Sequence, residues 1–241
     1  MNKERTHFGL VIGTLLGKSR GQTVHLSGII STDKVFDTMC QVDRGKYTHS
    51  TEAYVDEPRS IGFNATISAP HMHAYALEYL SDKLCGGRAL DIGSGSGYLT
   101  TCMALMNGPT GTVIGIEHMP ELQEVARRNI ESDHPELLRN GRIKLVVGDG
   151  RLGYPSEAPF DAIHVGAASS ETPNSVSAED RISQICITGT CRFPRKVALT
   201  VGGRGGKSSD VLVLSAKKFV SSAYRYVAIL RITGRRADQN I

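Results

Sequence analysis

The sequence predicts an α/β fold built around a mostly parallel sheet. Short segments rich in Val, Ile and Leu alternate with longer amphipathic segments through the middle of the chain, as strands alternate with helices. A length of 241 residues, 40% of them hydrophobic, suits one domain with a sizeable core. No apolar run approaches the roughly 18 residues of a membrane-spanning helix, so no membrane span is predicted.

The first two predicted elements are helices. DKVFDTMCQV has apolar residues at helical spacing, and Thr32 precedes it as a capping residue. Residues 44–69 contain turn residues and aromatics without a clear period, so no element is predicted there. A second helix is predicted in ISAPHMHAYALEYLSDKL, with Pro70 in the first turn, where proline is tolerated.

A strict alternation of strands and helices follows. The predicted strands are RALDIG, TVIGIE, RIKLVV and FDAIHV, and the helices between the first three are SGYLTTCMALM and PELQEVARRNIESD. Such βαβ units form parallel sheets with right-handed crossovers. We therefore expect a doubly wound, Rossmann-like sheet with helices on both faces, an N-terminal helical extension and C-terminal strands.

The C-terminal part is basic and less regular. Residues 170–195 fit neither element, whereas KVALTV, DVLVLSA and YRYVAILRIT are predicted strands. Residues 192–241 hold 11 Lys and Arg against two Asp, although the whole chain carries only +4. A basic tail can attract nucleic acid or anionic lipid. We interpret it instead as a solvated face of the last strands, and predict neither nucleic acid nor membrane as a partner.

The cysteines indicate a reducing compartment. They are scattered, no C-x-x-C occurs, and neither a disulfide framework nor a zinc site is predicted; the five are Cys40, Cys85, Cys102, Cys186 and Cys191. The N-terminal MNKERT and HFGLVIGTLLG are loosely similar to a secretory signal, but glycines interrupt the apolar run and no small-residue cleavage site follows. The predicted localisation is cytoplasmic.

A glycine-rich loop is the sharpest local motif. DIGSGSG, from Asp91 to Gly97, lies between a predicted strand and a predicted helix. Glycines there allow a tight turn and a close approach of a ligand to the backbone. A dinucleotide fingerprint would need glycine at position 98, which is Tyr98. The loop instead resembles the cofactor loop of class I S-adenosylmethionine-dependent methyltransferases, which makes Asp91, Gly93 and Gly95 candidate cofactor contacts.

Two acidic residues follow the next two strands. Glu117 ends its strand 20 residues after Gly97, where a carboxylate can accept hydrogen bonds from the ribose hydroxyls of an adenosine. Asp149 lies just past the third strand, at the same edge of the sheet, where it can accept the adenine amino group. The pair Asp149-Gly150 alone is also an ordinary turn signal.

Two longer stretches resemble the protein-L-isoaspartate (D-aspartate) O-methyltransferase family. They are GDGRLGYPSEAPFDAIHVGAA, from Gly148, and SIGFNATISAPHMHAYALEYL, from Ser60. With the glycine loop, the resemblance covers residues 28–168, which we take as the family-like core of a single domain, 1–241. Residues 1–27 and the basic part 169–241 diverge from the family pattern. Within residues 169–241, we expect KVALTVGG to take the place of a family strand and YRYVAILRIT to form the last strand.

The resemblance implies a repair enzyme. Such a monomeric enzyme uses S-adenosyl-L-methionine to methylate the α-carboxylate of L-isoaspartyl and D-aspartyl residues in damaged proteins. Ser68 would be the active-site residue, and Ala69, Pro70 and His71 would hold the substrate backbone. Cofactor contacts would fall on the glycine loop and on the residues that match the family's other motifs; these are Ala65, Thr66, Ile67, Ser68, His73, Ser96, Glu117, Asp149 and Gly150.

The implied chemistry needs few catalytic groups. A carboxylate is ionised at pH 7, so methylation requires no general base. Ser68 would orient the acceptor by a hydrogen bond, although a serine at a helix start can also be a simple cap. His71 and His73 have no Cys or carboxylate at ligand spacing, so no metal is predicted. Two alternatives remain at this point: a non-catalytic cofactor-binding or adaptor module of the same fold, and methyl transfer to another acceptor.

Overall fold

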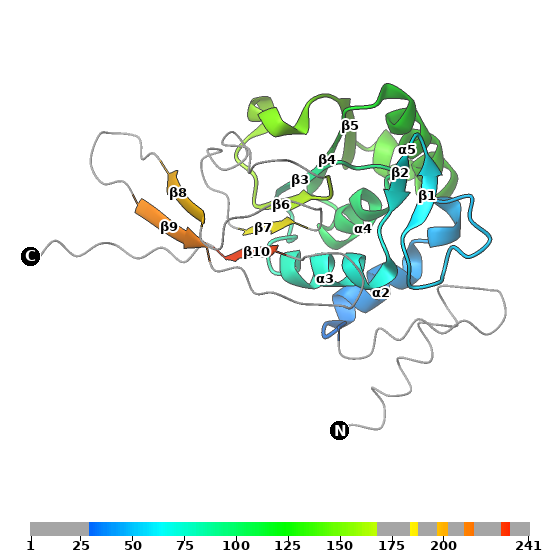
Figure 1. The fold of residues 1–241 in the computed structure, drawn as a ribbon, viewed down its shortest axis with the longest axis horizontal. Coiled ribbons are helices and arrows are strands. Elements are labelled where there is room, and N and C mark those ends of the chain that lie inside the picture. Colours follow the sequence, from blue (N-terminus) through cyan, green and yellow to red (C-terminus); the bar gives the residue numbers. More distant parts are fainter. Residues whose placement is uncertain (1–28, 168–183, 188–196, 202–209, 215–227, 232–241) are drawn as a thin grey trace, which may run out of the picture.

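A six-stranded sheet forms the centre of the molecule (Figure 1). The computed structural model describes residues 29–167, 184–187, 197–201, 210–214 and 228–231. The strand order is β10-β7-β6-β3-β4-β5, in which only β10 runs antiparallel to its neighbour. The strands are β3 (Arg88–Ile92), β4 (Thr112–Glu117), β5 (Ile143–Val147), β6 (Ala162–Val165), β7 (Gln184–Ile187) and β10 (Ala228–Arg231).

The order of the strands reverses beside β3. The chain moves outward from β3 to β4 and β5, then returns to place β6 on the other side of β3. Leu90 is accordingly paired with Ile114 of β4 and with Ile163 of β6. In open parallel sheets, ligands bind at such a reversal, outside the carboxyl ends of the strands. The predicted doubly wound sheet is confirmed.

The helices of the described residues form one connected layer. They are α2 (Asp33–Gln41), α3 (Pro70–Leu80), α4 (Tyr98–Met106), α5 (Pro120–Asp133) and the short α6 (Pro135–Arg139). α4 contacts α2, α3 and α5, and Figure 1 shows α2 and α3 side by side below the sheet. The prediction of helices on both faces of the sheet stays a prediction, since residues 168–183, which connect β6 to β7, lie outside the described residues. No helix of the described part is long and apolar enough to cross a membrane.

The N-terminal helix is attached to the core through its first turn. Thr32 caps α2, because its side chain accepts a hydrogen bond from the Val35 N–H, as predicted. Glu78 of α3 accepts further bonds from the N–H groups of Ser31 and Thr32. Val35 is fully buried against the core cluster. Residues 29–41 are therefore an integral part of the domain.

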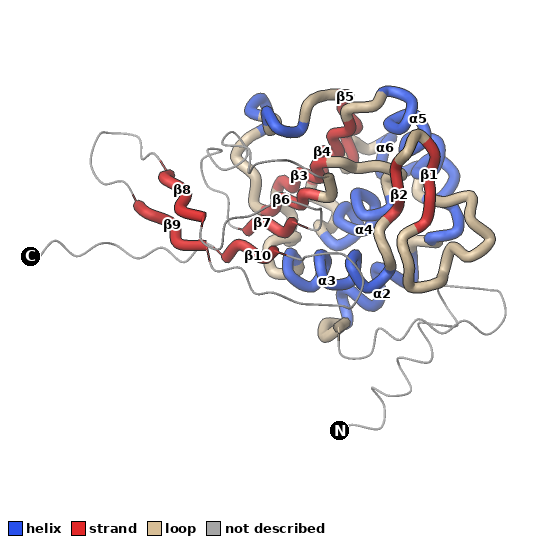
Figure 2. Tube along the Cα trace, viewed as in Figure 1, coloured by secondary structure: helices blue, strands red, loops and turns tan. Residues whose placement is uncertain are grey.

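A β-hairpin lies in the region where no element was predicted. β1 (Arg59–Gly62) pairs antiparallel with β2 (Ala65–Ile67), away from the central sheet (Figure 2). Phe63 and Asn64 form its two-residue turn with φ of 51° and 56°, the left-handed values that such turns require. The strands are too short for hydrophobic periodicity to show. A further short element, the 3-10 helix η1 (Arg44–Lys46), also lies in this region.

The C-terminal strands differ from the prediction in one respect. β8 (Val197–Val201) and β9 (Asp210–Leu214) form, but they pair only with each other in a separate two-stranded sheet. The expectation that KVALTV takes the family strand's place is wrong, since β7 occupies the position beside β6. β7 falls in the stretch that fitted neither element. YRYVAILRIT does supply the edge strand β10, antiparallel to β7.

Candidate active site

The glycine loop lies at the reversal of strand order. It connects β3 to α4, and its three glycines, Gly93, Gly95 and Gly97, have φ of 78°, 55° and 85°. The N–H of Gly93 donates to the carbonyl of Ile116 at 2.8 Å. A Cβ on Gly93 would sit 2.8 Å from the Cβ of Ala167, which follows β6. Glycine is therefore required here both for the backbone angle and for the close approach of two loops.

Glu117 lies at the end of β4 with its carboxylate against the glycine loop. The residue is only 5% exposed. Its Oε2 accepts a hydrogen bond from the Gly95 N–H at 3.2 Å, and its Oε1 accepts one from the His118 N–H at 2.9 Å. Oε1 also accepts a hydrogen bond from the Met119 N–H at 3.3 Å and lies 2.8 Å from Nδ1 of His118. A carboxylate oxygen has two acceptor positions, so Oε2 keeps one for a hydroxyl donor. The structure places Glu117 beside the glycine loop.

Asp149 has a different environment at the end of β5. It caps the 3-10 helix η2 (Gly150–Leu152), because its Oδ1 accepts a hydrogen bond from the Arg151 N–H at 3.0 Å. The Arg151 guanidinium also binds both carboxylate oxygens, with Nη2 2.7 Å from Oδ2. These hydrogen bonds lower the pKa of Asp149 to about 2. Asp149 is thus ionised and held by its own turn.

Asp91 contacts a neighbouring strand. Its Oδ1 lies 2.7 Å from Nδ1 of His164 in β6, and its Oδ2 accepts a hydrogen bond from the Thr100 hydroxyl at 2.5 Å. Asp91 is 1% exposed and His164 is 4% exposed. The carboxylate thus joins β3, α4 and β6 at the reversal point. No local pattern marks His164 as the partner of Asp91, because the two residues are 73 positions apart.

The segment from Ala65 to His71 joins the hairpin to α3. Ser68 is half-buried between β2 and α3, and within the described residues its hydroxyl has no hydrogen-bond partner. The residue that caps α3 is Ala69, without a side-chain bond, so the alternative of Ser68 as a helix cap is wrong. Asp56 instead accepts a hydrogen bond from the His71 N–H at 3.0 Å, and its Oδ1 lies 2.8 Å from the His71 ring.

The hairpin brings this segment to the glycine loop. β1 pairs with β2, and a Cβ on Gly95 would lie 3.5 Å from Cδ1 of Ile61 in β1. Ser96 is buried, and its carbonyl accepts a hydrogen bond from the Asn129 amide at 3.0 Å. The two predicted parts of the site, 30 residues apart in sequence, therefore meet in space. Within the described residues, no group of His, Cys, Asp and Glu could hold a metal ion.

His73 is buried beneath the loop helix. Its ring lies 4.9 Å from that of Tyr98, the first residue of α4, and its Nδ1 lies 3.3 Å from Nη1 of Arg44. Arg44, Asp56, Tyr98 and His164 were not singled out as site residues. Arg44 and Asp56 lie in the stretch without periodicity, and nothing local marks a buried arginine.

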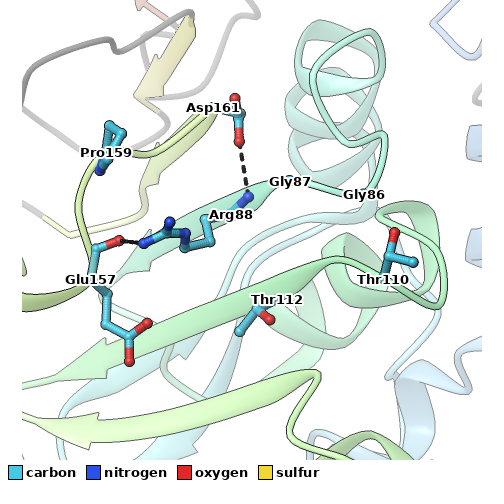
Figure 3. Close-up of a pocket in the computed structure, with 8 residues that line it drawn as sticks. All are labelled: Gly86, Gly87, Arg88, Thr110, Thr112, Glu157, Pro159 and Asp161. Carbon is cyan, nitrogen blue, oxygen red and sulfur yellow. Dashed lines mark hydrogen bonds between the residues drawn. The ribbon is translucent and has the colours of Figure 1, made fainter.

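A polar cavity of about 550 Å³ lies at the opposite end of the sheet (Figure 3). It opens at the amino ends of β3 and β4, near Gly87, Thr112 and Pro159. Its polar groups bind one another: Asp161 accepts a hydrogen bond from the Arg88 N–H at 2.9 Å, and the Arg88 guanidinium donates to the carbonyl of Glu157. None of the predicted site residues lines this cavity.

Comparison with known proteins decides the family. The family model described as protein-L-isoaspartate(D-aspartate) O-methyltransferase (PCMT) matches residues 22–180, well over half of the chain. The chain belongs to this family. The match includes the whole glycine loop, the hairpin and the strands β3 to β6, and it extends slightly beyond residues 28–168 at both ends.

Curated relatives within the family are close in sequence over the same part. A protein-L-isoaspartate O-methyltransferase of Caenorhabditis elegans is 51% identical over 150 residues, which are 62% of this chain and 66% of the relative. Protein-L-isoaspartate O-methyltransferase 2 of Arabidopsis thaliana is 52% identical over 166 residues, 67% of this chain and 54% of the relative. The chain thus spans less than two thirds of the length of these curated relatives.

Solved structures of the family share the fold. A crystal structure described as a beta-aspartate methyltransferase (PCMT) from Plasmodium falciparum, in complex with S-adenosyl-L-homocysteine, superposes with a TM-score of 0.63 at 33% identity. It covers 86% of this chain and 90% of that protein. The Rossmann-like fold predicted from the sequence is thereby confirmed.

Proposed function

We propose that this chain is a protein repair enzyme that transfers a methyl group from S-adenosyl-L-methionine to the α-carboxylate of L-isoaspartyl and D-aspartyl residues. The observation that carries the proposal is the meeting of two segments that are separate in sequence. The hairpin places the segment containing Ser68 beside the glycine loop, with Ile61 against Gly95. Family membership and the named relatives support the same reaction.

The residues present fit an adenosine-bearing cofactor. Glu117 is buried and held by backbone donors, and its Oε2 keeps one acceptor position for a ribose hydroxyl. Gly93 and Gly95 leave the loop backbone open to close approach. We propose contacts from the loop, from the hairpin segment and from the ends of β4 and β5; these are Ala65, Thr66, Ile67, Ser68, His73, Gly93, Gly95, Ser96, Glu117, Asp149 and Gly150. Asp91 would act by fixing the loop, because both its oxygens bind protein groups.

The chain's own part in the reaction is orientation. When bound, the cofactor supplies a methyl group on a sulfonium; the substrate carboxylate oxygen forms the new C–O bond while the C–S electrons return to sulfur. The acceptor is already an anion at pH 7, so no proton must be removed. Ser68 has a free hydroxyl that can hold the carboxylate, and Ala69, Pro70 and His71 would hold the peptide backbone. Fixed dipoles would replace the water lost from both charged reactants.

The activity can be tested directly with labelled cofactor. The purified chain is incubated with radiolabelled S-adenosylmethionine and an isoaspartyl peptide, with the matched aspartyl peptide as control. We expect base-labile label on the isoaspartyl peptide alone. Absence of label while S-adenosylhomocysteine still binds would instead identify a non-catalytic binding module. Label on both peptides would indicate a different acceptor.

Three further properties belong to the proposal. We propose that residues 1–241 form one domain, that the protein acts in the cytoplasm, and that it is a monomer. The described cysteines, Cys40, Cys85 and Cys102, are free thiols, as a reducing compartment favours. Size-exclusion chromatography with light scattering tests the monomer, and cell fractionation tests the localisation.

A further inference from the structure

Arg44 is a buried cation without an anionic partner. It begins η1 and is 1% exposed. Its Nε donates to the carbonyl of Ala53 at 2.6 Å, and its guanidinium carbon lies 5.7 Å from the centre of the Tyr98 ring. Among the described residues, no carboxylate forms an ion pair with it, and its buried Nη2 has no hydrogen-bond partner. Burial lowers its pKa to about 10, so it stays charged at pH 7.

The remaining contact of Arg44 is with His73. Nη1 lies 3.3 Å from Nδ1 of the imidazole. A guanidinium has five N–H donors and no acceptor, so Nδ1 of His73 must accept this hydrogen bond. The single proton of a neutral imidazole then lies on Nε2. Within the described residues, that Nε2 atom has no hydrogen-bond partner, so its donor is available.

The surroundings of His73 favour the neutral ring. Burial is the largest cause that lowers the pKa of His73 well below the usual value. The charges of Arg44, His164 and His71 lower it further. The aromatic neighbour, Tyr98, keeps its proton because burial raises its pKa well above the usual value. Asp56, whose charge acts on Arg44, is engaged by His71. No ion pair therefore favours the imidazolium form.

We propose that Arg44 is a positioning residue that fixes His73 as the Nε2–H tautomer and so presents one N–H donor to an oxygen of the cofactor. The role of His73 as a cofactor contact rests on the proposed function, whereas the tautomer does not. A buried, unpaired guanidinium is costly for the fold. A donor-only group at this position selects the Nε2–H tautomer, whereas a carboxylate would favour the Nδ1–H tautomer or the imidazolium, and an amide could pair with either tautomer.

The first test measures the tautomer in the protein as it is. The full chain, labelled with ¹⁵N in its histidines and without cofactor, is studied by NMR, with a His73→Gln variant to assign the signals. We expect the Nε2–H tautomer at pH 7 and protonation of His73 only well below the ordinary histidine pKa of about 6.5. An Nδ1–H tautomer, or protonation near pH 6.5, would overturn the proposal whatever the enzyme's activity.

The second test separates positioning from packing. Arg44→Met should weaken binding of S-adenosylhomocysteine by about three- to tenfold, the value of one hydrogen bond, and should give His73 mixed tautomers. In a His73→Gln background the same substitution should add no further loss. Equal losses in both backgrounds would show that Arg44 does not act through His73. If the wild-type chain binds no S-adenosylhomocysteine, the proposed function fails, while the tautomer result stands on its own.

Two further variants control for stability. Arg142→Met removes another arginine with a buried, unpartnered Nε, whose Nη2 donates to the carbonyl of Ala104 away from the site. It should lower the melting temperature but leave the His73 spectrum and the affinity for S-adenosylhomocysteine unchanged. Arg44→Lys keeps the charge in case Arg44→Met does not fold. Lysine also only donates, so His73 should remain the Nε2–H tautomer; a switch to Nδ1–H would contradict the proposal.

Discussion

Strands β3 and β6 are joined by a polar contact at each end, but one contact is buried and the other is exposed to solvent. At the carboxyl end, Asp91 lies 2.7 Å from His164, and both side chains are buried. At the amino end, Asp161 accepts a hydrogen bond from the Arg88 N–H at 2.9 Å, and both residues are exposed. Figure 3 shows that Arg88 binds Asp161 and Glu157 at the amino end. Near the carboxyl end, within the described residues, the Ser68 hydroxyl and Nε2 of His73 have no hydrogen-bond partner.

The difference in burial should give the largest effect on stability. Asp91→Ala leaves the Thr100 hydroxyl and His164 without their acceptor, so we expect a loss of about 3 kcal/mol in the free energy of unfolding. Asp161→Ala at the exposed end should cost less than about 1 kcal/mol. Urea denaturation of both variants measures the two values. Similar losses would show that burial does not distinguish the two ends.

Glycine substitutions should separate strain from function. Gly93→Ala places a Cβ 2.8 Å from Ala167 at a φ of 78°, and we expect the affinity for S-adenosylhomocysteine to fall by about 100-fold or more. Gly86→Ala is the matched control, since it has a φ of 94° and its Cβ would lie 2.7 Å from Oγ1 of Thr110 beside the amino-end cavity. It should lower the melting temperature with an affinity within about twofold of wild type. Calorimetry measures both, and a comparable affinity loss in Gly86→Ala would place the ligand elsewhere.

Two glutamates at opposite ends test the ribose assignment. Glu117→Gln keeps the shape of the side chain but removes the negative charge that strengthens a hydrogen bond from a ribose hydroxyl. We therefore expect about tenfold weaker binding of S-adenosylhomocysteine. Glu157→Gln removes a partner of Lys144, 2.5 Å away, and should leave binding unchanged. Fluorescence titration of both variants provides the measurement. Unchanged affinity in Glu117→Gln contradicts the assignment.

Ser68 should matter for turnover more than for binding. Its hydroxyl has no partner among the described residues, so Ser68→Ala removes nothing that the fold uses. We expect turnover on an isoaspartyl peptide to fall by about tenfold or more, because the acceptor carboxylate is held less well. The affinity for S-adenosylhomocysteine should fall less than turnover does. If turnover and affinity fall equally, Ser68 serves the cofactor alone.

The smallest effect concerns the pH dependence at Asp149. Its pKa is lowered to about 2 by the hydrogen bonds from Arg151, so its contribution to stability is present above the unfolded value of about 3.9 and is lost as the pH falls toward 2. Cofactor binding should therefore not change between pH 8 and 5 on account of Asp149. Arg151→Met should return the pKa toward the unfolded value, which an NMR titration of the carboxyl carbon detects. An unchanged pKa would show that Arg151 is not its cause.

The sequence predicted the central part of the fold well. All four strands and both helices between Arg88 and Val165 are confirmed, because each buries a regular apolar face that a local pattern reveals. The hairpin of residues 59–67 was missed, since its strands are three and four residues long and its turn depends on positive φ at Phe63 and Asn64. KVALTV was correctly predicted as a strand but was given the wrong neighbours, because periodicity contains no information on pairing.

The sequence by itself determined the glycine loop, the acidic residues at the ends of β4 and β5, and the family, since these depend on residue type and spacing along the chain. The tertiary structure alone decided which groups meet: Asp91 with His164, Ile61 with Gly95, and Arg44 with His73. The physical reason is the distance along the chain between the residues that interact. Turns, caps and amphipathic faces arise from residues a few positions apart, whereas each of these three contacts joins segments at least 29 positions apart and forms only when the sheet and its helix layer pack.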